Sequence, residues 1–340
     1  MMKHCRFAVG LLLLFTLGCQ SEKSSVATPS SNESSTASTP KPIDVTLAIN
    51  WYPEAEHGGF YAASVHGFYK EEGLNVTIRP GGPNVPVIAD VASGSIQFGV
   101  DNADKLLLLR AQQADVVVVM SPIQNSPRCI MVHKSSGMTR LEDLAATKSF
   151  TLAMNQGQPF AQFMMKKLKL DHVQVVPFPS GIAGFLSESA YGQQAYSFSE
   201  PFLAEEKGSD PQCLMLSDIG FNTYTSVLLT RRELIDKQSE VVAKMTKASI
   251  RGWKKYLAEP DETNQYIHEQ NPQMGMEILA YGAKALRSAC LPDGFEEARL
   301  GEMTADRWQT LVAQMTEIGS IKPDSVNAED AFTLQFIDQR

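Results

Sequence analysis

The sequence predicts an α/β protein whose chain forms two lobes joined by two crossings. A strand, loop and helix order recurs along residues 44–120, and a second series follows a proline-rich stretch at 121–127. Beyond residue 230 the pattern is helical, with no convincing strand. The 340 residues, 43% of them hydrophobic, suffice for about two packing units, since domains usually contain roughly 100 to 200 residues.

The first lobe is expected to alternate strands with helices. Val45, Leu47 and Ile49 alternate with polar or small residues, as in a strand with one buried face. The four consecutive valines at 116–119 fit a sheet that is covered on both faces. The expected strands are 44–50, 75–79, 96–100 and 115–120, and the expected helices are 60–69, 85–93 and 103–113.

The second lobe repeats this order before the chain returns to the first lobe. Its expected strands are 129–133, 150–154, 173–178 and 195–198, and its expected helices are 141–146, 159–168 and 182–190. A strand-like segment follows at 226–230, and helical stretches are expected at 231–257, 261–282 and 304–319. These patterns assign 43–127 and 231–340 to the first lobe and 128–230 to the second. Because such sheets bind ligands outside the carboxyl ends of their strands, we expect a ligand cleft between the lobes.

The first residues have the pattern of an export signal. Two basic residues precede an apolar run, 7–17, which is too short to span a bilayer, and Cys19 follows a glycine. Thr16-Leu-Gly-Cys resembles a bacterial lipobox, which implies that residues 1–18 are removed and that Cys19 carries lipid; an ordinary signal cut elsewhere is the alternative. The Ser, Thr and Pro content of 19–42 predicts a disordered tether. The folded part is therefore expected in the cell envelope, periplasmic or extracytoplasmic, and anchored to a membrane.

Composition and motifs argue against several classes of protein. A net charge of −8 without a basic stripe does not suit a nucleic-acid binder. The chain has no catalytic motif, no metal-ligand set and no cofactor fingerprint, so we expect a monomeric binding protein and not an enzyme. Cys129, Cys213 and Cys290 allow at most one disulfide, and we expect three unpaired, mostly buried thiols.

Three blocks of the sequence resemble one protein family. Residues 50–74 contain Asn-Trp-Tyr-Pro-Glu-Ala-Glu-His-Gly-Gly-Phe-Tyr-Ala-Ala and His-Gly-Phe-Tyr-Lys-Glu-Glu-Gly-Leu, and further blocks lie at 91–100 and 140–144. Over residues 43–260 they resemble the solute-binding proteins of ABC importers for sulfonates, nitrate and thiamine pyrimidine precursors. The resemblance implies the two-lobed periplasmic-binding-protein fold of type II, a small-molecule ligand and an ABC permease as partner.

The ligand expected from this resemblance is a thiamine pyrimidine precursor. Trp51, Pro53 and His57 are most similar to the pyrimidine-precursor branch of the family. An anion of the sulfonate or nitrate type is the first alternative. Related pyrimidine synthases consume the histidine that corresponds to His57, so an enzyme of that kind is the second alternative, and a tethered sensor is the third.

Loops at the strand ends supply the candidate ligand-binding residues. Trp51 offers a flat stacking surface to a heteroaromatic ring, and Glu200 can accept a hydrogen bond from an exocyclic amine. His57 begins a helix, where we expect it to be neutral. A core position for Trp51 and a helix-capping role for Glu200 are the alternatives. The remaining candidates are Tyr52, Gly58, Asn84, Asp101, Asn102, Gln124, Asn155 and Tyr196.

Five of these candidates carry a second interpretation. Gly58 permits close backbone approach, and its amide, like those around Asn155, can bind an anion at a helix start. Asp101 or Asn102 can instead cap the following helix. Tyr196 shares a sheet face with its second neighbour along the strand and suits the core equally well.

Overall fold

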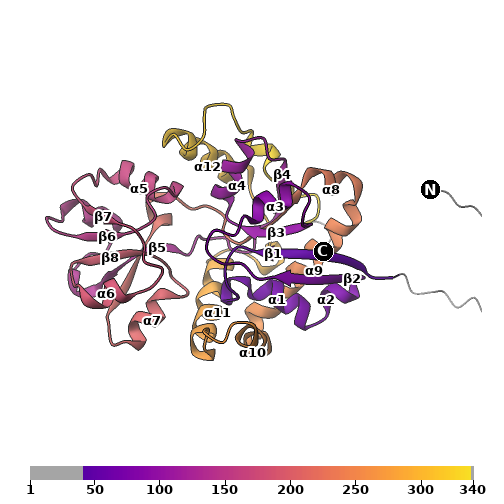
Figure 1. Ribbon diagram of the computed structural model, residues 1–340, viewed down its shortest axis with the longest axis horizontal. Helices are drawn as coiled ribbons and strands as arrows, with labels where there is room; N and C mark the ends of the chain where they lie inside the picture. The colour runs from indigo at the N-terminus through magenta and orange to yellow at the C-terminus, as the bar shows by residue number, and fades with distance from the viewer. Residues whose placement is uncertain (1–40, 338–340) are drawn as a thin grey trace, which may run out of the picture. The chain divides into compact units, whose positions relative to one another are not determined.

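The computed structural model describes residues 41–337. The expected signal peptide, Cys19 and nearly all of the expected tether lie outside these residues, so lipid anchoring stays a prediction. Within 41–337, no helix combines the length and the apolar character that a bilayer crossing requires. The described chain is an α/β fold with two separate sheets, which confirms the expected class (Figure 1).

The first sheet has five strands and mixed direction. In spatial order they are β2 (Leu74–Arg79), β1 (Ile43–Ile49), β3 (Phe98–Asp101), β10 (Val227–Arg231) and β4 (Val116–Met120). β1 pairs in parallel with β2 and β3, whereas β10 runs antiparallel between β3 and β4. All five residues of β4 are buried, which confirms the expected cover on both faces.

The position of β10 corrects the expected return of the chain. We placed 226–230 in the second lobe, but this segment pairs with β3 and β4 of the first sheet. The chain therefore returns to the first lobe one strand earlier than residue 231. An apolar strand that is buried on both faces fits either sheet equally well, so its sequence did not indicate which sheet it joins.

The second sheet also has five strands. In spatial order they are β7 (Gln174–Val176), β6 (Thr151–Ala153), β8 (Tyr191–Tyr196), β5 (Arg128–His133) and β9 (Pro211–Met215). β9 was not predicted, because it has no clear alternation and begins with a proline. β9 is an edge strand, where a proline is tolerated.

A disulfide between β5 and β9 contradicts the expectation of three free thiols. Cys129 and Cys213 are bonded to each other, and their Cα atoms are 5.4 Å apart. Cys290 is free and buried. Because β9 was not predicted, no sequence pattern indicated that these two cysteines would meet.

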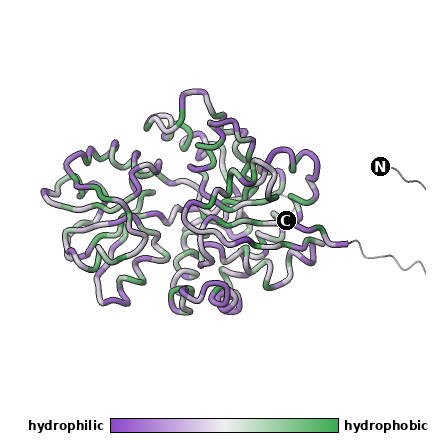
Figure 2. The backbone as a smooth tube through the Cα atoms, viewed as in Figure 1, coloured by the Kyte–Doolittle hydropathy of each residue, from purple (hydrophilic) through white to green (hydrophobic). Residues whose placement is uncertain are grey.

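Helices cover both sheets, and Figure 2 shows hydrophobic stretches in the interior of each half with hydrophilic ones on the outer loops. With the second sheet lie α5 (Pro159–Leu168), α6 (Ala183–Ser187) and α7 (Glu200–Glu206). The other α-helices are α1 (Gly58–Val65), α2 (Phe68–Glu71), α3 (Val87–Ala92), α4 (Ala103–Arg110), α8 (Arg232–Lys237), α9 (Ser239–Ala258), α10 (Asp261–Gln270), α11 (Met276–Cys290) and α12 (Ala305–Glu317). The 3-10 helices are η1 (Ala55–His57), η2 (Lys134–Ser136), η3 (Leu141–Ala146), η4 (Leu216–Ile219), η5 (Glu297–Arg299) and η6 (Ala328–Asp330).

Three expected helical stretches are interrupted, and the stretch at 261–282 divides into α10 and α11. The other two divide at single residues. The helix expected at 60–69 divides into α1 and α2 because Gly67 adopts a left-handed φ of 76°. The helix expected at 231–257 divides into α8 and α9 at Gln238, whose φ of −139° and ψ of 46° are not helical. Both breaks are single-residue backbone features inside a continuous apolar pattern, which explains why the pattern did not reveal them.

Arg307 on α12 holds together the two crossings between the lobes. Its Nε donates at 2.7 Å to the carbonyl oxygen of Asn222, which lies in the second crossing, the segment 220–226 between η4 and β10. A second guanidinium nitrogen donates to the carbonyl oxygen of Gln124 in the first crossing. The guanidinium also lies over the Tyr224 ring, 3.8 Å from its centroid. One side chain therefore fixes the spacing of the two segments about which the lobes are connected.

Candidate functional site

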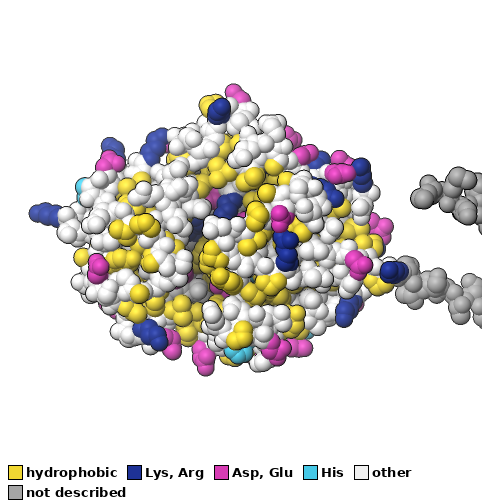
Figure 3. All heavy atoms as spheres, in the orientation of Figure 1, with side chains coloured by type: hydrophobic (Ala, Val, Ile, Leu, Met, Phe, Trp, Pro, Cys, Tyr) yellow, Lys and Arg dark blue, Asp and Glu magenta, His cyan; other side chains and the backbone are white. Residues whose placement is uncertain are grey.

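A cavity of about 550 Å³ lies between the two lobes. This volume is within the range of small-molecule sites, which is about 300 to 1,000 Å³. Figure 3 shows the corresponding face hollowed between the halves, with basic side chains visible in the hollow. The lining residues are Asn50, Trp51, Glu54, Glu56, Gly82, Pro83, Asn84, Val85, Asn102 and Lys105 from the first lobe, and Arg128, Asn155, Gln158, Phe160, Phe178, Ser180, Gln194, Ala195, Tyr196, Phe198, Ser199 and Glu200 from the second.

The structure brings six of the candidate residues together at this cavity. They come from strand-end loops of both sheets, at the positions where a cleft was expected. The cavity-lining candidates are Trp51, Asn84, Asn102, Asn155, Tyr196 and Glu200. Five other candidates lie away from it, namely Tyr52, His57, Gly58, Asp101 and Gln124.

His57 is fully buried behind the cavity wall. Its Nε2 lies 3.1 Å from the side-chain oxygen of Asn50 and 3.3 Å from a carboxylate oxygen of Glu56. Burial lowers the pKa of His57 to about 3, although a backbone hydrogen bond to Tyr52 acts in the opposite direction. Burial therefore keeps the imidazole neutral, which is the charge state that we expected.

Gly58 serves helix packing in the structure. A Cβ at Gly58 would lie 2.1 Å from a ring carbon of Tyr256 on α9. At Gly59 a Cβ would lie equally close to Trp253 of the same helix. The two glycines therefore allow α1 and α9 to touch, which accounts for their presence without a bound anion.

The other candidates outside the cavity have local partners. Asp101 pairs with Lys105 at 3.2 Å and accepts from the backbone of Asn102. The side-chain nitrogen of Gln124 donates to the backbone oxygen of Ser121 inside the first crossing. Tyr52 is 49% exposed and touches Trp51 edge-on, with ring centroids 5.4 Å apart.

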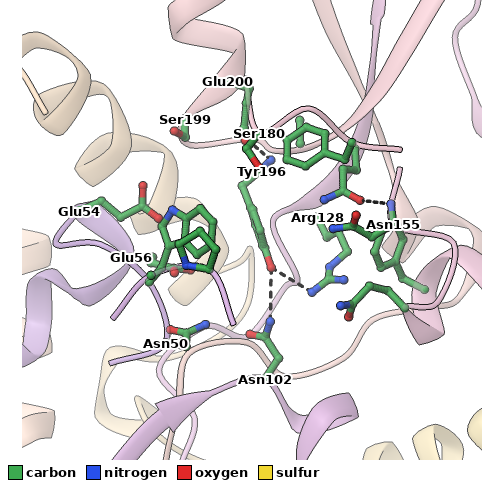
Figure 4. Close-up of a pocket in the computed structure, with 18 of the residues that line it drawn as sticks. Asn50, Glu54, Glu56, Asn102, Arg128, Asn155, Ser180, Tyr196, Ser199 and Glu200 are labelled. Carbon is green, nitrogen blue, oxygen red and sulfur yellow. Dashed lines mark hydrogen bonds between the residues drawn. The ribbon is translucent and has the colours of Figure 1, made fainter. Parts of the chain in front are cut away.

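Three carboxyl groups form the acidic wall of the cavity, which we define as Glu54, Glu56 and Glu200. Glu54 directly precedes η1 and Glu56 lies within it, and they are 8% and 4% exposed. Glu200 begins α7 in the other lobe, and one of its oxygens accepts from the backbone N–H of Tyr196 at 2.8 Å. Figure 4 shows the three side chains around one end of the cavity. The sequence analysis selected only Glu200, because nothing in the local pattern separates Glu54 and Glu56 from ordinary surface acids.

Burial and mutual repulsion make the acidic wall resist ionisation. Burial raises the pKa of Glu54 well above its ordinary value, and Glu56 and Glu200 raise it further. Burial also raises the pKa of Glu56 to about 7, while a hydrogen bond from Ser226 acts against the increase. The pKa of Glu200 is raised by burial as well. Near neutral pH Glu56 is therefore present both as a carboxylate acceptor and as a carboxylic acid donor.

Tyr196 connects the two lobes at the other side of the cavity. Its hydroxyl accepts from Asn102 of the first lobe at 3.3 Å and from Arg128 at 2.9 Å (Figure 4). Asn102 is itself fixed, because its side-chain oxygen accepts from the backbone of Ser226. The Tyr196 ring stacks on Phe198 with centroids 5.3 Å apart. Tyr196 thus has a stacking partner, as its alternative interpretation required, and it also lines the cavity.

The loops that end in the cavity carry strained backbone. Asn84 and Ser180 have φ values of 63° and 56°, which place non-glycine residues in the left-handed region. Such strain is concentrated at binding sites.

The backbone amide of Asn155, which we expected to be free to bind an anion, instead donates to the side-chain oxygen of Gln194 at 2.8 Å.

Comparison with known proteins assigns the chain to a family. Residues 54–263 match the family described as NMT1/THI5 like, and this stretch is more than half of the chain. The chain belongs to the NMT1/THI5 like family. The stretch that matches this family begins at the acidic wall and includes Glu54, Glu56, Arg128 and Glu200.

Two relatives match almost the whole chain. The formylaminopyrimidine-binding protein of Halalkalibacterium halodurans is 23% identical over 335 residues, which cover 95% of this chain and 96% of the relative. The riboflavin-binding protein RibY of Chloroflexus aurantiacus is 23% identical over 357 aligned residues, which cover 99% of each. A shorter match, 29% identical over 105 residues and 31% of this chain, is to the 4-amino-5-hydroxymethyl-2-methylpyrimidine phosphate synthase of Legionella pneumophila.

The fold is shared with solved binding proteins. The periplasmic aliphatic sulphonate binding protein SsuA of Escherichia coli has a TM-score of 0.61 and 14% identity, over 85% of this chain and 91% of that chain. This likeness confirms the expected two-lobed binding-protein fold. Within residues 41–337, no group of three His, Cys, Asp or Glu side chains is arranged to hold a metal ion.

Proposed function

We propose that this protein is the solute-binding component of an ABC importer and that it captures an aminopyrimidine of the thiamine-precursor type. The two lobes enclose the solute in the cavity between them and present it to a permease. A lipid on Cys19 holds the folded part at a membrane of the cell envelope. The proposal is supported by two relatives that are named as binding proteins and match over nearly their full lengths.

The acidic wall beside Trp51 is the observation that carries the ligand assignment. An indole face stacks on a heteroaromatic ring, and such stacking contributes about 1 to 3 kcal/mol. An aminopyrimidine edge presents an amine donor beside a ring-nitrogen acceptor. A carboxylate accepts from the amine, and a neighbouring carboxylic acid donates to the ring nitrogen. Glu56, whose pKa is raised by burial to about 7, supplies both forms near neutral pH.

Contacts from both lobes give the mechanism of capture. Trp51 and Glu54 belong to the first lobe, whereas Glu200 belongs to the second. A solute that touches all three stabilises the closed arrangement relative to an open one, by the difference in its affinity for the two. The bond between Asn102 and Tyr196 joins the same two lobes directly. The permease then recognises the closed form.

The environment of His57 favours a binding protein over a pyrimidine synthase. A histidine that is consumed as a substrate must be reached from the cavity, but His57 is 0% exposed and does not line the cavity. Incubation with the cofactor of the related synthases and iron should therefore leave the mass of the His57 peptide unchanged. A modified peptide would support the synthase instead.

Calorimetric titration with 4-amino-5-hydroxymethyl-2-methylpyrimidine tests the proposal. We expect binding to the wild type and at least tenfold weaker binding to Trp51→Ala and to Glu200→Gln, because each loses about 1.4 kcal/mol or more. Riboflavin and an alkanesulfonate serve as competing candidates. Tighter binding of either compound than of the pyrimidine would reassign the ligand.

Each variant has a matched control in the chain. Tyr52→Ala removes the neighbouring aromatic ring, which is exposed and outside the cavity. Glu206→Gln makes the Glu200 substitution on an exposed position of the same helix, α7. Both controls should bind like the wild type. Equal losses in Trp51→Ala and Tyr52→Ala would remove Trp51 from the site.

A further inference from the structure

Arg128 is a buried cation without an ion pair at the cavity wall. It begins β5, directly after the first crossing, and it is 6% exposed. One terminal nitrogen donates to the Tyr196 hydroxyl at 2.9 Å, but Nε has no hydrogen-bond partner. The guanidinium lies 4.4 Å from the centroid of the Phe160 ring, on α5. Among residues 41–337, no carboxylate forms an ion pair with it.

The protein compensates this charge through groups at a distance and not through a direct ionic partner. Buried ions are normally paired, because removing a charge from water costs several kcal/mol. Asp104 and Glu56 act on Arg128 only at longer range than an ion pair. A neutral hydroxyl and an aromatic face are weaker partners than an anion. A negative group of a ligand would therefore gain the most binding free energy on the cavity side of the guanidinium.

The wall around Arg128 differs from the acidic wall in its chemistry. Asn155, Gln158 and Ser180 line the cavity in the same lobe, and all three carry neutral hydrogen-bonding side chains. Figure 4 shows Arg128 with Asn155 on one side of the cavity and Glu54 with Glu56 on the opposite side. The cavity thus offers acids at one end and an unpaired cation at the other.

We propose that the natural solute has two unlike ends, an amine-bearing ring that meets the acidic wall and an anionic group, carboxylate or phosphate, that pairs with Arg128. The inference rests on the proposed function for the ring end and adds the anionic end. A planar guanidinium binds both anions through paired hydrogen bonds, so the geometry assigns the shared chemistry and the experiment separates the two.

The test compares three probes of matched structure by calorimetry on the wild-type protein. They are 4-amino-5-hydroxymethyl-2-methylpyrimidine, its phosphate ester and the corresponding 5-carboxylate. We expect at least one anionic probe to bind about tenfold or more tightly than the neutral parent, and the better anion identifies the class. Equal or weaker binding of both anions would overturn the proposal, and this comparison needs no variant.

Arg128→Gln locates the effect. This variant should lose the preference for the anion, measured as the ratio of its affinities for the anionic probe and for the neutral parent. Lys148→Gln removes one positive charge from an exposed position of the same lobe and should keep the preference. Arg128→Lys, which retains charge, guards against a folding defect and should keep part of the preference. A preference that survives in Arg128→Gln contradicts the assignment.

Inorganic phosphate separates this proposal from the proposed function. Phosphate alone should raise the melting temperature of the wild type and not that of Arg128→Gln. If no pyrimidine binds but this difference persists, the ring assignment fails and the anion site stands. If phosphate stabilises both proteins equally, an adventitious ion only is present, and the anion site is refuted.

Discussion

The raised pKa of Glu56 predicts that this side chain makes the protein less stable as the pH rises toward neutrality. Its pKa increases from 4.5 to about 7 because the carboxyl is buried. Below pH 4.5 both the folded and the unfolded chain hold the proton, whereas between pH 4.5 and 7 only the folded chain does. The free energy of unfolding therefore falls with rising pH across this window. Each pH unit corresponds to about 1.4 kcal/mol, so the full effect is on the order of 3 kcal/mol.

Glu56→Gln removes this titration and nearly preserves the shape of the side chain. We expect the stability of the wild type, measured relative to this variant by urea unfolding, to decrease by about 3 kcal/mol between pH 4.5 and pH 8. His57, whose pKa is lowered by burial, contributes an opposite trend in both proteins, because it stabilises the folded state increasingly as the pH rises from about 3 to 6.5. Glu142→Gln, at an exposed position, should give no such trend. A difference in stability between the wild type and Glu56→Gln that does not change with pH would refute the reasoning.

Three further predictions concern packing and the connection of the lobes. A Cβ at Gly252 would lie 2.1 Å from the carbonyl oxygen of Gly59, so Gly252→Ala should destabilise the protein by about 1 to 3 kcal/mol in calorimetry; an unchanged melting temperature would contradict the close helix contact. Arg307→Ala removes the hydrogen bonds to both crossings, so it should lower the free energy of unfolding by about 2 kcal/mol and weaken solute binding. An effect on stability without an effect on binding would show that this side chain does not position the lobes. The Cys129–Cys213 disulfide spans 84 residues, so its reduction should lower the free energy of unfolding by roughly 4 kcal/mol. If both thiols react with an alkylating agent before reduction, the disulfide is absent.

Much of the fold follows from local pattern. The helix at Pro159–Leu168 has the predicted bounds, because a proline at its first position and an apolar stripe define it locally. β4 was equally clear as an unbroken apolar run. β9 and the break at Gln238 were not predicted, since pairing with a distant strand and a single non-helical residue leave no periodic signal.

The site was predicted less completely than the fold. Glu200 and Trp51 follow strand ends, so the general rule for ligand clefts selected them. Arg128 lies at the start of a strand, whereas that rule selects only residues that follow the carboxyl end of a strand. Glu54 and Glu56 lie beside His57, but the 3-10 turn exposes the two acids to the cavity and buries the imidazole behind it. Neighbouring residues thus received opposite environments that a linear pattern does not distinguish.

The sequence by itself determined the α/β class, the two-lobed organisation and the strand-end loops from which a cleft is built, because these depend on residue periodicity and chain order. Only the tertiary structure decided which sheet β10 joins, that Cys129 meets Cys213, and that three acids face the cavity across from an unpaired arginine. Burial and charge proximity depend on segments separated by up to about 150 residues, from Glu54 to Glu200. The pKa values and the ligand chemistry of the cavity are consequences of that proximity, so they exist only once the chain has folded.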